Sequence, residues 1–186
     1  MSGNNKKQNS PSSLPLDSRL RGNDTESEVT EIKRFTFMPN LTERRTLPYS
    51  AKQIYELVID IEKYPEFLPW CKQARIIEVT SPTNLIADLL ISFKNFFEKY
   101  RSDVKHGEVK EGEYFVDVVA IQGPFKSLVN NWKFRDLEDG KSCEIEFFIE
   151  FQFNSFFLEK MLGAIFGRAT QKMMAAFEER AREVLK

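Results

Sequence analysis

The sequence predicts an α+β fold in which a curved antiparallel sheet of about six or seven strands wraps around a long C-terminal helix, with two short helices near the start. Three observations predict it. An amphipathic helix with a capping signal comes early in the chain, a series of strand-like segments with short connections follows, and apolar residues recur at helical spacing after Ser155. Consecutive strands joined by short connections form antiparallel sheets. The 186 residues suffice for one such domain and a tail.

Residues 1–37 differ in composition from the rest of the chain. They contain six basic and five acidic residues, and their longest apolar stretch before Ile32 is Leu14-Pro15-Leu16. Such a segment cannot bury enough apolar surface to offset the chain entropy that folding removes, so we expect a disordered polar N-terminal extension. It also lacks the continuous apolar region of a secretory signal. The folded domain is therefore predicted to span residues 38–186.

The first predicted helix begins after Ser50. Ser50 and Gln53 have the spacing of a capping box, in which the side chain of each residue accepts a hydrogen bond from the backbone N–H of the other. The apolar residues that follow fall at positions i, i+3, i+4 and i+7 of one helix face, and they are Ile54, Leu57, Val58 and Ile61. Pro65 then ends the helical segment.

The run 64–71 (YPEFLPWC) combines two prolines with four large apolar side chains, those of Tyr64, Phe67, Leu68 and Trp70. Each proline fixes its own φ angle and disfavours helix for the residue before it, so the segment is predicted to be stiff and kinked. Two interpretations remain open, and they are compatible: a buried corner that caps the core, and the mouth of an apolar ligand cavity.

Strand-like segments are predicted over 75–80, 85–93, 96–105, 113–122, 128–137 and 143–153. In the last of them one face carries Cys143, Ile145, Phe147, Ile149, Phe151 and Phe153. Glu144, Glu146 and Glu150 lie on the opposite face, so we expect the first set to be buried and the glutamates to be exposed.

From residue 156 to the C-terminus the pattern predicts one long helix. Its apolar face comprises Phe157, Leu158, Met161, Leu162, Ile165, Phe166, Ala169, Met173, Phe177 and Ala181. Gly163 and Gly167 interrupt the middle of this helix, which fits either close packing against the sheet or room for a ligand.

Catalytic patterns are scarce. His106, the one histidine, precedes Gly107 at a predicted hairpin end, where we expect it on the surface. Cys71 and Cys143 are too few and too far apart for a disulfide scaffold or a zinc site, and we expect buried free thiols in a reducing compartment. No catalytic triad, metal-ligand or nucleotide-binding motif occurs in the sequence. We therefore predict no catalytic residue, no metal and no cofactor, and a binding protein rather than an enzyme.

Net charge and hydropathy limit the classes of partner that the sequence favours. The formal net charge of −1 argues against a nucleic-acid binder that works by bulk electrostatics, and we expect no DNA among the partners. No apolar run approaches the ~20 residues of a membrane span. We expect a cytoplasmic protein that is at most peripheral to the inner membrane of a bacterium, making transient contact with the membrane surface.

Several motifs, in this order and spacing, resemble one known superfamily. They are 44–51 (RRTLPYSA), 60–71 (DIEKYPEFLPWC), 123–125 (GPF), Leu128 with Asn131, Trp132 and Phe134, 147–155 (FFIEFQFNS) and 174–181 (MAAFEERA). Together they resemble the START-like (Bet v 1-type) superfamily, whose fold is the helix grip. Within it they resemble the coenzyme Q-binding and polyketide cyclase-related branch, which includes the ribosome-association toxin type. Met38-Pro39 looks like the usual start of that family.

The resemblance implies a choice of functions. The first is a carrier or chaperone that binds ubiquinone or a related polyprenyl lipid between the sheet and the C-terminal helix and supports respiration or quinone biosynthesis. The alternatives are a toxin-type protein that binds the large ribosomal subunit and blocks subunit association, and a polyketide cyclase-like enzyme. The 17 phenylalanines and the 64–71 run favour the carrier, because both suit an apolar pocket.

The predicted ligand-binding residues follow from these faces. They are Tyr64, Phe67, Leu68, Trp70, Tyr100, Phe125, Asn131, Trp132, Phe147, Ile149, Phe151, Phe157, Met161, Leu162, Ile165, Phe166 and Met173. Asn131 and Tyr100 are the candidates for hydrogen bonds to a quinone head. A ribosome contact would instead need a positive surface, which the last helix offers through Lys160, Arg168, Lys172, Arg180 and Arg182. Four glutamates, at 159, 178, 179 and 183, dilute those charges, which is typical of the solvated face of a helix.

Overall fold

The structure is a computed structural model and describes residues 40–93, 96–163 and 166–185. Seven strands form one antiparallel sheet, in the order β1-β7-β6-β5-β4-β3-β2. The strands are β1 Asn40–Leu47, β2 Cys71–Ser81, β3 Asn84–Phe93, β4 Phe96–Lys110, β5 Glu113–Gln122, β6 Phe125–Asp136 and β7 Cys143–Phe153. The helices are α1 Ala51–Ile59, η1 Ile61–Lys63, α2 Tyr64–Phe67, α3 Phe156–Gly163 and α4 Phe166–Val184. The predicted fold class is confirmed.

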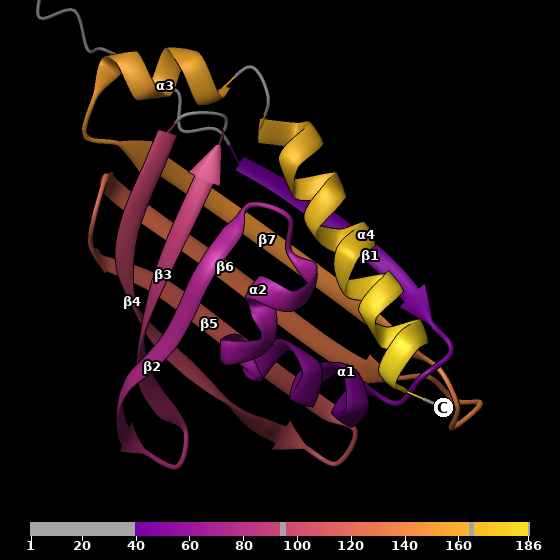
Figure 1. The fold of residues 1–186 in the computed structure, drawn as a ribbon. Coiled ribbons are helices and arrows are strands. Elements are labelled where there is room, and N and C mark those ends of the chain that lie inside the picture. The colour runs from indigo at the N-terminus through magenta and orange to yellow at the C-terminus, as the bar shows by residue number, and fades with distance from the viewer. Residues whose placement is uncertain (1–39, 94–95, 164–165, 186) are drawn as a thin grey trace, which may run out of the picture. The chain divides into compact units, whose positions relative to one another are not determined.

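All helices that cover the sheet lie on its inner face (Figure 1). Helix α1 begins with the predicted capping box, in which the Gln53 backbone N–H donates to the Ser50 hydroxyl and the Ser50 N–H donates to the Gln53 side chain. The carboxylate of Asp136 on β6 accepts a further hydrogen bond from the Ala51 N–H at 2.6 Å. This contact fixes the start of α1 to the sheet.

The buried apolar face predicted for the last strand is confirmed for all but one of its residues, but the predicted exposure of the opposite glutamates is wrong. Cys143, Ile145, Phe147, Phe151 and Phe153 are buried, whereas Ile149 in their midst is only half-buried. The glutamates opposite, which we expected to be exposed, are also half-buried. Two of them, Glu144 and Glu146, are flanked by the long side chains with which they form ion pairs.

Strand β1 carries no recognisable alternation in the sequence, and none was predicted for 40–47. The reason is that two charged residues, Glu43 and Arg45, share its inner side with Leu41 and Leu47. Arg45 forms ion pairs with Glu43 at 2.9 Å and with Glu178 of α4 at 3.1 Å. Charged residues thus occupy inward-facing positions of β1 at which apolar residues would have revealed the strand in the sequence.

The single C-terminal helix predicted from residue 156 is wrong in one respect, because it is two helices. Helix α3 ends at Gly163 and α4 begins at Phe166, with Gly167 as its second residue. Glycine has a low helix propensity, so a pair of glycines favours a break at this point. The two helices run in different directions in Figure 1.

The expected position of His106 is also wrong. Strand β4 continues through it to Lys110, and the turn glycine is Gly112, whose φ angle is +75°. Gly107 lies within the strand, where an added Cβ would meet the Phe115 ring at 3.4 Å. That is an ordinary contact distance, so Gly107 marks no turn, and the sequence signal for a hairpin end was misplaced by five residues. The predicted N-terminal extension, 1–37, lies outside the described residues and stays a prediction.

Candidate functional site

The 64–71 segment forms a corner that is tied down at both ends. The Tyr64 hydroxyl donates to the Val58 carbonyl at 2.5 Å, and the Leu68 carbonyl accepts from the Cys71 N–H at 3.0 Å. Leu68 is 2% exposed. Burial also raises the pKa of the Tyr64 hydroxyl, so this group stays protonated at physiological pH. Tyr64 and Leu68 therefore belong to the core of the corner.

The rings of this corner pack against α4. Tyr64 and Phe67 make edge-to-face contacts with Phe177, with ring centroids 5.4 and 5.1 Å apart. Arg180 lies over the Phe67 ring at 5.6 Å and forms an ion pair with Glu66 at 2.5 Å. Arg180 is thus engaged in holding α2 to α4.

Trp70 differs from its neighbours in the corner. Its backbone carbonyl accepts from the Ser92 N–H at 2.7 Å, which joins the corner to the end of β3. Its indole is half-buried, and the buried Nε1–H has no hydrogen-bond partner among the described residues.

The inner face of the sheet holds two apolar clusters. The larger one combines Trp132 and Phe147 with Phe177 of α4, and the Trp132 ring lies 4.5 Å from that of Phe147 and 5.2 Å from that of Phe177. The second cluster consists of Leu128, Phe151, Phe153 and Leu158, with Phe125 and Ala120 packed against it. Tyr100 contacts Phe125 at 5.5 Å and packs against the larger cluster. Burial raises the pKa of the Tyr100 hydroxyl.

The predicted ligand residues other than Asn131 divide into three groups. The inner face or the corner contains Tyr64, Phe67, Leu68, Trp70, Tyr100, Phe125, Trp132, Phe147, Ile149, Phe151 and Met173. Phe157 on α3 is instead 69% exposed. Met161, Leu162, Ile165 and Phe166 lie outside the residues whose side chains are described.

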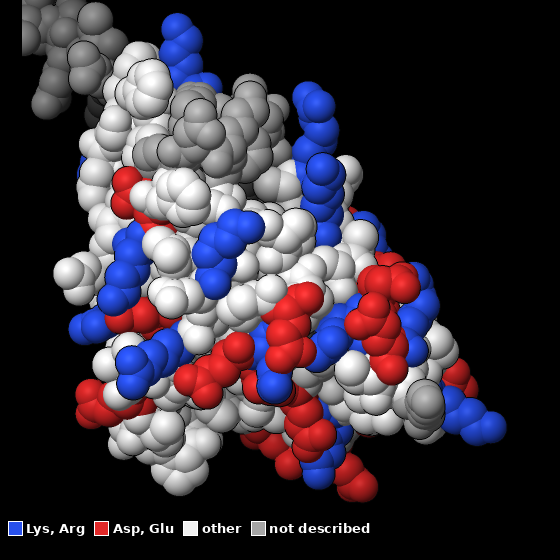
Figure 2. Space-filling model, in the orientation of Figure 1, with Lys and Arg blue, Asp and Glu red and all other residues white. Residues whose placement is uncertain are grey.

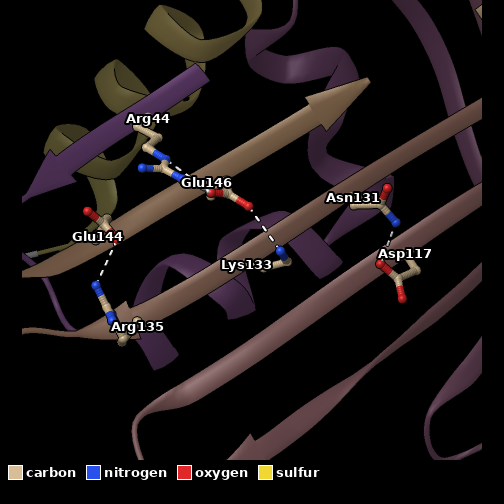
Figure 3. Close-up of polar contacts among 7 residues, drawn as sticks. All are labelled: Arg44, Asp117, Asn131, Lys133, Arg135, Glu144 and Glu146. Carbon is tan, nitrogen blue, oxygen red and sulfur yellow. Dashed lines mark hydrogen bonds and ion pairs between the residues drawn. The ribbon is translucent and has the colours of Figure 1, made fainter. Parts of the chain in front are cut away.

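Asn131 does not face the ligand side that was predicted for it. It alternates with Trp132 along β6, so its side chain lies on the outer face of the sheet. There its Nδ2 donates to Asp117 Oδ1 on β5 at 2.6 Å (Figure 3). The residue on the inner face is its neighbour Asn130, which sequence reasoning missed because both positions carry the same amino acid.

The outer face carries a ladder of ion pairs, which sequence reasoning also missed. Glu146 on β7 accepts from Arg44 on β1 at 2.6 Å and from Lys133 on β6 at 3.0 Å, and Arg135 pairs with Glu144 at 2.9 Å (Figure 3). The hydrogen bonds from Lys133 and Arg44 hold the pKa of the Glu146 carboxyl below its usual value. A hollow of about 450 Å³ lies among these side chains, bordered by Thr42 and Phe148 as well. The Glu146 carboxylate beside this hollow is thus paired and ionised, and it is not placed to act as a proton donor.

Exposed lysine and arginine side chains lie together at one end of the sheet. At this end, which we name the α3 end, β3, β5 and β7 finish, β2, β4 and β6 begin, and α3 and α4 start. Five exposed cations at this end have no ion-pair partner among the described residues, and they are Lys72, Lys126, Lys160, Arg168 and Lys172. Figure 2 shows acidic side chains gathered in the lower half of the drawn face and mostly blue and white groups in its upper half.

Large apolar side chains are exposed at the same end. Phe97 at the start of β4 is 60% exposed, and Phe156 on α3 is 80% exposed. The other arginines predicted for the last helix are engaged elsewhere, because Arg182 pairs with Glu178 and Glu179 and Arg180 with Glu66. The α3 end therefore combines free positive charge with aromatic surface.

His106 lies in a small polar cluster under α1. Its Nδ1 is 2.7 Å from the Tyr55 hydroxyl, and Tyr55 stacks on Tyr114 at 4.9 Å. The Tyr114 hydroxyl donates in turn to Glu108 at 3.4 Å. Burial lowers the pKa of His106, so the folded protein favours the neutral ring.

This burial predicts a loss of stability in mild acid. As the pH falls below about 6.5, the unfolded chain gains a proton at His106 that the folded chain resists, so the free energy of unfolding decreases. The stabilisation is complete above that pH and declines until the lowered pKa of the folded state is reached. Melting temperatures between pH 7.5 and 5.5 should fall more steeply for the wild type than for His106→Gln. Equal slopes for the two proteins would contradict the role of His106.

The two cysteines are free and buried, as predicted. Burial raises the pKa of the Cys71 thiol to about 11 and that of Cys143 to about 12. Both are neutral at physiological pH, and a thiol rather than a thiolate is a poor nucleophile. No described helix is long and apolar enough to cross a membrane.

Comparisons with known proteins give a family and several relatives. Residues 47–178 match the family described as "Polyketide cyclase / dehydrase and lipid transport". The chain is 44% identical over 142 residues to the "Ribosome association toxin RatA" of Rickettsia prowazekii, covering 76% of this chain and 95% of that protein. It is 33% identical over 147 residues to the protein of the same name from Escherichia coli, covering 79% of this chain and 89% of that protein.

A second kind of relative has a different name. The "Coenzyme Q-binding protein COQ10 homolog B, mitochondrial" of Xenopus laevis is 26% identical over 143 residues, which cover 75% of this chain and 57% of that protein. Among solved structures, the 18 kDa protein CC1736 of Caulobacter crescentus is 34% identical with a TM-score of 0.63, covering 79% of this chain and 98% of that one. The Zhui aromatase/cyclase of Streptomyces is similar in fold, with a TM-score of 0.69 at 13% identity, covering 80% of this chain and 96% of that one.

Proposed function

Since the chain belongs to the polyketide cyclase / dehydrase and lipid transport family, we propose that it is a ribosome-associating member of the toxin type, which binds the large ribosomal subunit through the α3 end. This order reverses the ranking reached from sequence alone. The relatives named as ribosome association toxins are more similar to this chain than the coenzyme Q-binding relative is, and they are matched over nearly their whole length.

The observation that carries the proposal is the set of five exposed cations at the α3 end that have no ion-pair partner within 40–93, 96–163 and 166–185. Ribosomal RNA presents a dense array of phosphates, and cations that are free of protein partners can contact phosphates without first breaking an ion pair. The exposed rings of Phe97 and Phe156 add surfaces on which unpaired bases stack. In this proposal the protein acts in the cytoplasm, by binding rather than by catalysis.

Sedimentation tests this function directly. The purified full-length protein is mixed with large subunits, small subunits or intact ribosomes and centrifuged through a sucrose gradient. We expect co-sedimentation with large subunits that weakens steeply between 50 and 200 mM salt, as phosphate contacts require. We also expect free subunits to accumulate when large and small subunits are mixed in its presence. Absence of co-sedimentation at the lower salt concentration would refute the proposal.

A second candidate function is the binding of ubiquinone or a related polyprenyl lipid, and the inner face of the sheet favours it. Its two apolar clusters are separated by a row of half-buried residues, Ile149, Asn130 and Val118. An isoprenoid tail that covers such a row gains about 25 cal/mol for each Å² removed from water. The cations and aromatic rings at the α3 end would then suit transient contact with an anionic membrane surface.

Native mass spectrometry of protein purified from its host tests the second candidate. A co-purifying species with the mass of a polyprenyl quinone supports it. A protein that carries no lipid and takes up none from quinone-loaded vesicles would exclude it. The two functions place their ligands on different parts of the protein and need different probes, so each result is interpretable without the other.

A further inference from the structure

Asn130 is a polar residue on the apolar side of the sheet. It lies on β6 between Leu128 and Trp132, and these alternate residues share one face. In the register of the sheet it is opposite Ile149 of β7 and Val118 of β5. Its neighbour Asn131 lies on the other face, where Asp117 satisfies its amide.

The surroundings of Asn130 are less tightly packed than the rows on either side. On one side, Trp132 aligns with the fully buried Phe147, and on the other, Leu128 aligns with the buried Phe151. Ile149 and Val118, which flank Asn130, pack against the larger cluster yet keep part of their surface exposed. The row therefore lies where the larger cluster and the second cluster fail to close over the sheet.

The amide oxygen of Asn130 lacks a partner in this place. It is buried and accepts no hydrogen bond from the described residues. A buried polar atom without a partner destabilises the folded protein, and native proteins retain few of them. An apolar residue at this position would pack against Ile149 and Val118 without that cost. Asparagine at position 130 thus fits a group that enters from outside the chain.

We propose that Asn130 is the polar contact of an apolar ligand. The ligand lies along Ile149 and Val118 and forms one hydrogen bond with the Asn130 amide. The amide can accept from a hydroxyl through its oxygen or, rotated by half a turn, donate to a carbonyl through its nitrogen. The ligand class is therefore an amphiphile with an oxygen-bearing ring or head on a long hydrocarbon body. The inference rests on the second candidate function and names the residue that would form a hydrogen bond with the polar head of the ligand.

The test compares two adjacent asparagines on opposite faces, with decylubiquinone as the probe. Wild type, Asn130→Leu and Asn131→Leu are titrated, and quenching of tryptophan fluorescence is followed. Trp132 lies two residues from Asn130 on the same face, so a quinone held there should quench it. We expect Asn130→Leu to bind about tenfold more weakly, as the loss of one buried hydrogen bond predicts. Asn131→Leu should bind within about twofold of wild type.

Melting temperatures separate this role from a structural one. Asn130→Leu removes an unpaired buried polar atom, so its ligand-free melting temperature should equal or exceed that of wild type. Asn131→Leu breaks the hydrogen bond to Asp117, so its melting temperature should not rise above that of wild type. Lower stability of Asn130→Leu, or unchanged decylubiquinone affinity, would overturn the inference while leaving the second candidate function standing. If wild type itself binds no decylubiquinone, the inference fails together with that function.

Discussion

Replacement of Lys160, Arg168 and Lys172 by glutamate is expected to weaken binding of the protein to large ribosomal subunits by at least about 100-fold at physiological salt. Each of the three is exposed and has no ion-pair partner among the described residues, so each is free to contact a phosphate. Reversal removes that attraction and adds repulsion. If all three contact phosphates, the dependence of log K on log salt should also become shallower by about three units.

The matched control reverses three cations at the opposite end of the sheet, Lys105, Lys110 and Lys141. They lie on β4 and in the β6–β7 turn, away from α3 and the start of α4. The control changes the net charge by the same amount, so it should reduce binding far less if contact is local. Circular dichroism and a melting curve for each variant check the fold. Equal losses for the two triple variants would indicate nonspecific attraction and would remove the α3 end as the docking surface.

The largest effect on stability is expected from Phe147→Ala. Phe147 is completely buried and its ring packs 4.5 Å from that of Trp132. Truncation of such a phenylalanine leaves a cavity and costs about 3–5 kcal/mol of unfolding free energy. That is a large share of the 5–15 kcal/mol by which domains are typically stable. Urea denaturation should show a lower midpoint at an unchanged slope.

The neighbouring Phe148 provides the control. It lies on the outer face and borders the hollow above the ion-pair ladder, so Phe148→Ala should cost about 1 kcal/mol or less. Side-by-side urea curves therefore compare the same substitution on two faces of one strand. A cost below about 1 kcal/mol for Phe147→Ala would mean that its side chain borders open space and would contradict the packing described above.

Several elements were predictable because local pattern and tertiary environment agree. The capping box of Ser50 and Gln53 depends on residues three apart, and it forms as predicted. Strand β7 was predicted because the apolar residues of one face pack into the two core clusters, so their alternation is visible in the sequence. Strand β1 was missed because Glu43 and Arg45 face inward, where Arg45 pairs with Glu43 and with Glu178 of α4. Nothing within 40–47 records that distant partner.

The preference for a carrier arose from aromatic content, and the structure explains why that signal was ambiguous. Tyr64 and Leu68 fill a corner, while Trp132 and Phe147 pack against each other and against α4, as core residues of any member of this fold would. A count of phenylalanines cannot separate core from cavity. The distinction depends on which rows of the sheet are left uncovered.

The sequence by itself determined the sheet-and-helix architecture, the family and the two competing functions, because hydrophobic period and motif order are properties of the chain. Tertiary structure decided which asparagine faces the apolar side and which cations remain free. Asn130 and Asn131 are identical in the sequence and are separated only by the pleat of β6. Arg180 and Lys172 carry the same charge on one helix, yet only Arg180 meets a carboxylate of α2, because ion pairing depends on what the fold brings within reach.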